Sequence, residues 1–148
     1  MPSEERHPPD DPRAWLDRAR SNLIRAQQRH PNVYLEDLCF DAQQAAEKAI
    51  KALCIERGID FPYVHDLAQL ITLLQDKGQP VPDEVKEAGR LTRYAVFTRY
   101  PGLDDSVTEE EHEQAVEIAE SVVRWVESHL ETGGEPSDSR SDGGETIS

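Results

Sequence analysis

Two stretches of this chain carry basic and aromatic side chains at a density that could bind a charged ligand. The first places three arginines and two tyrosines between positions 90 and 100, and the second places three basic residues between positions 48 and 57. Guanidinium groups hold phosphate oxygens through paired hydrogen bonds, and tyrosine rings stack on bases. The pattern predicts a ligand-binding surface for the phosphate of a nucleotide or RNA, formed by Lys48, Lys51, Arg93, Arg99 and Tyr100. The alternative is that each arginine pairs with a neighbouring acidic side chain and remains solvated.

His65 is the histidine that we consider for proton transfer. It directly precedes Asp66, where a helix is expected to begin. Imidazole titrates near neutral pH, so His65 could act as a titratable group beside a groove. We favour the alternative, in which His65 is a loop residue that fixes the entry of the chain into the helix. The sequence contains no serine in a nucleophile-elbow context and no glycine-rich phosphate loop.

The remaining histidines and the cysteines do not have metal-ligand spacing. A di-iron bundle needs Glu-x-x-His on two helices, and Glu109 with His112 supplies that spacing once. Cys39 and Cys54 are too far apart for a Cys-x-x-Cys zinc half-site. Both cysteines fall within one helical pattern, where they cannot bridge each other, as expected in a reducing compartment. We therefore expect no metal, no cofactor and a cytoplasmic location.

Helices must position these side chains, because five segments repeat apolar residues at spacings of three and four and none alternates like a strand. The segments begin near Arg13, Tyr34, Asp66, Asp83 and Thr108. His30-Pro31-Asn32, Gly58, Gly78 and Pro101-Gly102 separate them. Short connections between long helices favour antiparallel neighbours. The expected fold is all-α, an up-and-down bundle of four principal helices plus one short helix starting at Asp66.

The segment from about Tyr34 to Arg57 is the longest and should be the central helix. Its wide apolar band is rich in alanine, which lets two neighbouring helices pack closely. Glu47 lies four residues before Lys51, so we expect a favourable ion pair on the exposed side of this helix. Gly58 suits a left-handed cap after its last turn.

Two capping boxes mark helix starts further along the chain. Asp66 with Gln69 resembles one such box, and Thr108 with Glu111 forms another. The second is followed by a strongly acidic helix, since residues 104–120 contain eight acids and no basic residue. Negative charge in a first helical turn is favoured by the helix dipole.

The charge of the chain is divided between the bundle and its ends. The formal net charge is −14, and residues 1–12 with residues 131–148 hold nine acids and two arginines. These ends are poor in apolar residues, so we expect a disordered N-terminal arm at 1–12 and a disordered acidic tail at 131–148. The bundle at 13–130 keeps 21 acids and 14 basic residues, a net charge of −7. A domain of this sign is not drawn to nucleic acid or anionic lipid as a whole, so any nucleic-acid contact needs a local basic patch. No apolar run is long enough to span a membrane, and we expect no membrane contact.

Four segments together resemble HEPN domains. They are the Phe40–Leu53 segment, read as FDAQQAAEKAIKAL, then His65-Asp66-Leu67, the early Trp15-Leu16 and the late Arg99-Tyr100-Pro101-Gly102. They agree with the family in order and spacing over about Ala14 to Val126. The resemblance implies a helical bundle that often dimerises. It also implies a partner, because many HEPN domains are encoded beside a small nucleotidyltransferase as toxin–antitoxin-like pairs.

Many HEPN domains are metal-independent RNases, whose motif is an arginine, four to six residues and a histidine, late in the bundle. The matching region here, Arg90 to Gly102, contains three arginines and no histidine. Arg25 with His30 and Arg124 with His129 meet the spacing, but in the first and last helices. We therefore do not expect an enzyme.

Three functions remain open from the sequence. The first is a HEPN-like binding module that dimerises, pairs with a nucleotidyltransferase and binds the phosphate of a nucleotide or RNA. The second is an RNase toxin of the same family with a displaced site, for which His65 and Arg99 are the catalytic candidates. The third is a purely structural helical bundle without a ligand.

Overall fold

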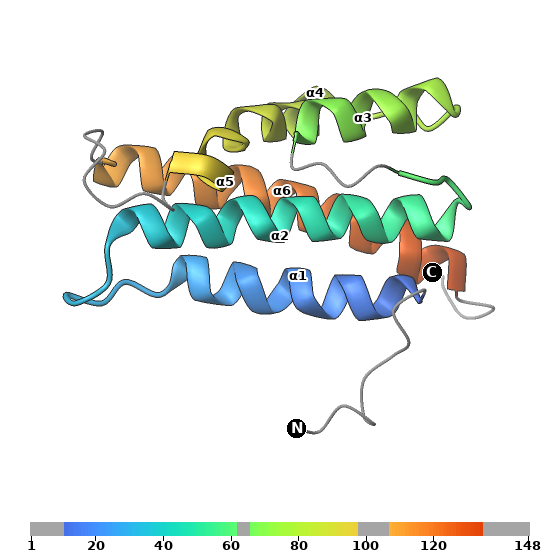
Figure 1. Ribbon diagram of the computed structural model, residues 1–148. Helices are drawn as coiled ribbons and strands as arrows, with labels where there is room; N and C mark the ends of the chain where they lie inside the picture. Colours follow the sequence, from blue (N-terminus) through green and yellow to red (C-terminus); the bar gives the residue numbers. More distant parts are fainter. Residues whose placement is uncertain (1–10, 62–65, 98–106, 135–148) are drawn as a thin grey trace, which may run out of the picture.

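The computed structural model describes residues 11–61, 66–97 and 107–134 of the chain, and these form an all-α bundle (Figure 1). Its elements are α1 (Pro12–Gln27), α2 (Leu35–Glu56), α3 (Leu67–Asp76), α4 (Asp83–Lys86), the 3₁₀ turn η2 (Glu87–Leu91), α5 (Arg93–Phe97) and α6 (Glu109–Gly134). The described residues contain no strand. None of these helices is both long and apolar enough to cross a membrane.

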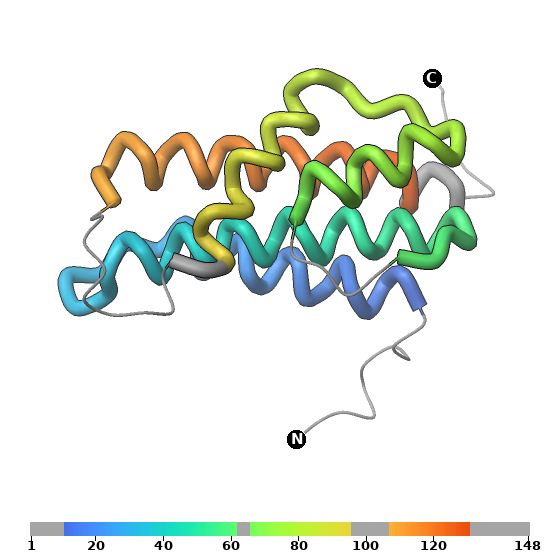
Figure 2. The backbone as a smooth tube through the Cα atoms, turned by 45° about the horizontal axis from the view of Figure 1, so that its top comes forward, coloured from blue at the N-terminus to red at the C-terminus, as the bar shows by residue number. Residues whose placement is uncertain are grey.

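The long helices α1, α2 and α6 lie side by side (Figures 1 and 2). Arg20 pairs with Glu127 and Gln27 with Glu120, so α1 and α6 run in opposite directions. The α4–η2–α5 segment runs back along α2, and α6 then runs parallel to α2 (Figure 1). The direction thus alternates through α1, α2, α4–α5 and α6, with α3 as an additional short helix. The predicted all-α, up-and-down arrangement is confirmed.

Helix α2 is central to the bundle, as its composition predicted. It contacts α1, α3, η2, α5 and α6. Five of its alanines are completely buried: Ala42, Ala45, Ala46, Ala49 and Ala52. Side chains this small allow the axes of α1 and α6 to approach that of α2 closely. Ile50 and Leu53, also fully buried, supply the larger apolar volume.

The caps of the helices form largely as the sequence predicts. Gly58 has φ 70° after α2, in the left-handed region that favours glycine. The Thr108 hydroxyl accepts a hydrogen bond from the backbone N–H of Glu111 at 3.1 Å, and the Glu111 carboxylate accepts one from the N–H of Thr108 at 2.9 Å. The Asp66 carboxylate accepts from the N–H of Ala68 at 3.1 Å. These bonds satisfy donors that a helix N-terminus leaves unpaired.

The fourth predicted helix is divided into three short pieces, which is a departure from the expected continuous element. α4 ends at Lys86, η2 follows as a 3₁₀ turn, and α5 begins only at Arg93. Gly89 lies in the middle of η2, and a Cβ atom there would stand 3.3 Å from the Cβ of Ala68 on α3. Glycine is a weak helix former, and its missing side chain lets η2 press against α3. The last helix also runs to Gly134, beyond the expected end at position 130.

Candidate functional site

Lys51, one of the predicted ligand-binding residues, forms a buried ion pair. Its Nζ lies 2.7 Å from the Glu47 carboxylate, and the side chains of Lys51 and Glu47 are 5% and 4% exposed. Gln43 donates a further hydrogen bond to Glu47 at 2.8 Å. The expectation that this pair lies on an exposed side was wrong. Trp15 of α1 and Phe61, beyond the end of α2, cover it, with ring centroids 5.8 and 5.5 Å from Nζ. The ammonium of Lys51 is therefore already neutralised inside the protein.

Arg93, a second predicted ligand-binding residue, lies elsewhere on the bundle. It is exposed on α5, with its guanidinium carbon 5.4 Å from the centre of the Tyr94 ring. Tyr94 is buried, and its side chain forms a hydrogen bond with that of Cys39. Cys39 precedes Lys51 on α2 by three turns, or roughly 18 Å of helix. The structure thus does not bring Arg93 and Lys51 together on one surface.

The other three candidates, His65, Arg99 and Tyr100, lie outside the described residues. The predicted roles of His65 and Arg99 in catalysis, and of Arg99 and Tyr100 in binding, therefore stay predictions.

Lys48, the remaining candidate, belongs to a polar network between α1 and α2. Its Nζ donates a hydrogen bond to the side-chain oxygen of Asn22 at 3.0 Å. The Asn22 amide nitrogen donates to the Asp41 carboxylate at 2.9 Å, and Arg25 forms an ion pair with the same carboxylate oxygen at 2.9 Å. Asn22 and Asp41 are buried, whereas Lys48 is half-buried and Arg25 is exposed. The buried side chains of Asn22 and Asp41 therefore hold the cationic groups of Lys48 and Arg25 at the surface.

Charges of both signs lie around Lys48. Burial lowers the pKa of Lys48 below its ordinary value, and the neighbouring Arg18 and Arg25 lower it further, whereas Glu47 and Asp41 act in the opposite direction. Neither arginine was among the binding residues predicted from the sequence, although Arg25 was noted there for its spacing to His30. The signal was present, because positions 18, 22 and 25 are spaced by four and three and so share one side of α1. The sequence does not show the α1–α2 register, and this register places that side of α1 against Lys48.

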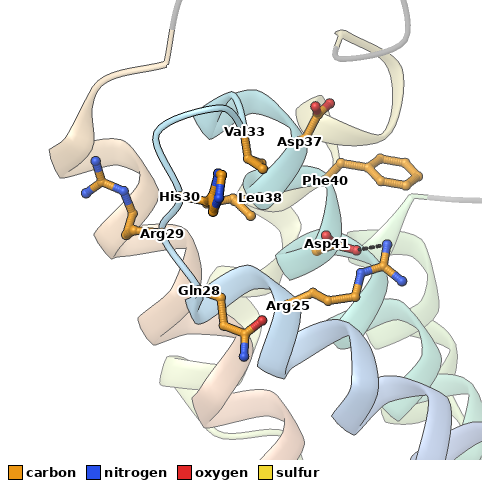
Figure 3. Close-up of a pocket in the computed structure, with 9 residues that line it drawn as sticks. All are labelled: Arg25, Gln28, Arg29, His30, Val33, Asp37, Leu38, Phe40 and Asp41. Atoms are coloured by element: carbon orange, nitrogen blue, oxygen red, sulfur yellow. Dashed lines mark ion pairs between the residues drawn. The ribbon is translucent and has the colours of Figure 1, made fainter.

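An open groove continues from this network along the α1–α2 turn (Figure 3). Its volume is about 780 Å³, and Arg25, His30, Val33, Phe40 and Asp41 are among the residues that line it. Arg25 and His30 have the spacing of the RNase motif, and both face this groove. Arg25 is engaged by Asp41, and the Nδ1 atom of His30 accepts a hydrogen bond from the Asn32 backbone at 3.0 Å.

The histidines of α6 have structural partners. The buried His112 ring donates from Nε2 to the carbonyl of Ala26 at 2.7 Å, and its Nδ1 has no hydrogen-bond partner. His129 lies 3.2 Å from the Arg57 guanidinium, and burial together with this charge lowers its pKa below the ordinary value. Across residues 11–61, 66–97 and 107–134, no group of three or more metal-ligating side chains is found.

Three large apolar side chains are exposed near the α1–α2 turn. Ile24 on α1 is 54% exposed, Val33 in the turn 39%, and Tyr34 at the start of α2 75%. They are the large apolar side chains that stand exposed within the described part of the chain. A tyrosine with most of its ring in water is a frequent contact residue in protein interfaces.

The chain is similar in sequence and in fold to known proteins. Residues 12–129 match the family model described as HEPN domain. The solved structure of TT1696 from Thermus thermophilus is 33% identical, covers 80% of this chain and 98% of its own, and superposes with a TM-score of 0.67. The structure of ST0689, described as an archaeal HEPN homologue, is 24% identical, covers 82% and 98%, and has a TM-score of 0.65, which supports the fold alone. Among functionally curated proteins, none matches the chain.

Proposed function

The chain belongs to the HEPN domain family, and from this membership we propose that it is a binding module that dimerises and pairs with a protein of the nucleotidyltransferase family. Both kinds of partner come from the properties that the family resemblance implies. In this proposal the chain provides a binding surface, and the nucleotidyltransferase-family partner catalyses the reaction.

The exposed apolar group of Ile24, Val33 and Tyr34 is the observation that carries the proposal. Burying apolar surface is worth roughly 25 cal/mol per Å², so covering these side chains favours association. Arg29 and Gln28 beside them are exposed polar side chains, which suits the polar rim of an interface. In a symmetric dimer one patch contacts the same patch of the second copy, so a substitution there acts twice.

Light scattering on the purified chain tests dimerisation. The expected mass is twice the 16.7 kDa of the chain. Ile24→Gln and Tyr34→Gln should shift the protein toward the monomer at the same concentration. Thr72→Gln, at an exposed position on α3, serves as the matched control and should leave the mass unchanged. A monomeric parent at concentrations of about 100 μM would contradict self-association, since an interface this weak would have little role.

Capture of the endogenous protein tests the second partner. Affinity recovery under mild salt, followed by intact mass analysis, should yield a companion protein of the nucleotidyltransferase family in constant ratio to this chain. The Tyr34→Gln variant shows whether that companion uses the same surface. Repeated recovery of this chain alone would count against the pairing.

The RNase alternative makes a different prediction for the same protein. Cleavage without metal requires a histidine positioned as a base and a cation beside the reacting phosphate. Purified protein should leave structured and unstructured RNA intact, with and without EDTA. Cleavage that disappears in both His65→Ala and Arg99→Ala would replace the binding proposal with the RNase interpretation.

A further inference from the structure

We propose that Arg18, Arg25 and Lys48 form a binding site for a phosphate group, carried by a nucleotide or an RNA chain, on the surface shared by α1 and α2. This site differs in composition from the one expected from the sequence. Only Lys48 is common to both sets. The three cations lie on a different side of α1 from Ile24, because Arg18 and Arg25 are seven residues apart and Ile24 projects about 100° away from Arg25. The adjoining groove shares Val33 with the exposed apolar group.

The cations are held in position by a buried scaffold rather than by solvent contacts. An ammonium group only donates hydrogen bonds, so the Asn22 atom that faces Lys48 at 3.0 Å must be the amide oxygen. The amide nitrogen is then directed at the Asp41 carboxylate, which it reaches at 2.9 Å. Asn22 and Asp41 are 7% and 6% exposed. Fixed side chains of this kind lose little conformational freedom when a ligand binds.

Asp41 extends the scaffold to Arg25. The carboxylate oxygen that accepts from Asn22 also lies 2.9 Å from the Arg25 guanidinium. Arg25 therefore offers further N–H donors in a fork whose orientation Asp41 restrains, and its side chain is 64% exposed. A guanidinium held in this way can accept a phosphate on its free edge.

The cluster has more positive than negative charge. Arg18, Arg25 and Lys48 share the carboxylate of Asp41, because Glu47, which also lies near Lys48, is engaged by Lys51, and Asp17 forms an ion pair with Arg20. In the part of the chain that the structure describes, no carboxylate forms an ion pair with Arg18 or Lys48. The mutual repulsion of these cations also lowers the pKa of Lys48. A bound anion removes this repulsion, which gives the site a reason to select negative charge.

Phosphate fits the site better than a carboxylate does. The terminal phosphate of a nucleotide is a monoester with about −1.5 to −2 charges at neutral pH and three acceptor oxygens, which match the cations left unbalanced by Asp41. An internal phosphate of an RNA chain is a diester with one negative charge, and successive phosphates of the chain supply the second. Phe40 is half-buried on the adjoining groove, and its ring and the Arg25 guanidinium point to the same side of the turn in Figure 3. Aromatic rings beside a phosphate site provide stacking surfaces for bases. The groove of about 780 Å³ is of a size that accommodates a mononucleotide.

Fluorescence anisotropy with a labelled single-stranded RNA of about 12 nucleotides tests the site, with ATP and inorganic phosphate as competitors. Lys48→Gln and Arg18→Gln should each weaken binding about tenfold, as expected when a charged hydrogen bond is lost. Lys48→Arg should retain most of the affinity. Arg124→Gln, an exposed arginine on α6, and Lys86→Gln, on α4, are controls that should bind as the parent does. Each lost phosphate contact should also reduce the steepness of the salt dependence by about one.

The competitors identify the source of the phosphate. Displacement of RNA by ATP at millimolar concentration supports a nucleotide site, and resistance to ATP supports an RNA backbone site. Circular dichroism on Lys48→Gln and Arg18→Gln checks that both variants fold, and light scattering checks that their oligomeric state is that of the parent. A dimer that binds no phosphate ligand would overturn this site while leaving the proposed function intact. Equal competition by poly-glutamate, or loss of binding in Arg93→Gln but not in Lys48→Gln, would also overturn it.

Discussion

Replacing Lys51 by methionine gives the sharpest test of whether the Glu47–Lys51 ion pair is buried. Methionine keeps most of the length of the lysine stem but removes the ammonium that lies 2.7 Å from Glu47. The Glu47 carboxylate, 4% exposed, would then remain in the interior without its counter-charge. Removing one partner of a buried ion pair typically costs about 3–5 kcal/mol of folding free energy.

The remaining contacts of Glu47 place the expected loss at the lower end of that range. Gln43 still donates a hydrogen bond to the carboxylate at 2.8 Å, which partly compensates for the missing ammonium. We therefore expect Lys51→Met to lower the free energy of unfolding by about 3 kcal/mol. The double variant Glu47→Gln/Lys51→Met removes both charges and should lie within about 1 kcal/mol of the parent, because no uncompensated charge is left.

Urea unfolding followed by the fluorescence of Trp15 and Trp125 and by circular dichroism measures this difference. With a slope between about 1 and 3 kcal/mol per molar urea, a loss of 3 kcal/mol lowers the midpoint by roughly 1–3 M. Lys86→Met is the matched control, because Lys86 lies 3.8 Å from an exposed Asp83 and should change stability by less than about 0.5 kcal/mol. If Lys51→Met were as mild as Lys86→Met, the Glu47–Lys51 pair would be solvated and the burial argument refuted.

Three further predictions concern thiols, a cap and a histidine. Burial raises the pKa of Cys39 to about 12 and that of Cys54 to about 11. A thiol reagent at about pH 8 should therefore label the native protein only as fast as the protein unfolds. In urea, both thiols of each chain should react. Thr108→Ala removes one half of a capping box and should cost about 1 kcal/mol in urea unfolding, with Gln75→Ala on α3 as the control. The folded state lowers the pKa of His129, so the unfolded chain binds more protons as pH falls through its ordinary value near 6.5, and stability is lost in that window. His129→Gln should therefore show a smaller fall in Tm between about pH 7.5 and pH 5.5.

Periodicity and end signals were sufficient to predict the fold. The alanine-rich band of α2 specifies close packing on two sides, and Gly58 and the Thr108–Glu111 box mark helix ends through local chemistry alone. These features depend on residues that are close in sequence, so the sequence alone is sufficient to predict them. The break at Gly89 depends instead on its contact with Ala68, which is distant in sequence. A weak helix former yields to such a contact, and the sequence does not reveal where that contact lies.

The candidate site was less predictable for a related reason. The Glu47–Lys51 face is opposite the apolar band of α2, which normally indicates solvent. Trp15 and Phe61 cover it from outside the helix, and no local pattern shows that they do. Arg18 was overlooked because its neighbour on α2 becomes known only when the α1–α2 register is fixed.

The contrast between Lys48 and Lys51 nevertheless has a local origin. Lys51 has a carboxylate four residues earlier, at Glu47, and this partner allows its charge to be buried. The corresponding position for Lys48 is occupied by Gln44, and the residue four positions later is Ala52, so no side chain at helical contact distance on α2 can neutralise it. A lysine on a central helix without a counter-charge of its own must take a partner from another element or from a ligand. In this protein the partner is the uncharged amide of Asn22, which orients the ammonium but does not neutralise it. The positive charge that remains beside Arg18 and Arg25 is therefore set by the order of residues along α2, and it is the property that a phosphate ligand would use.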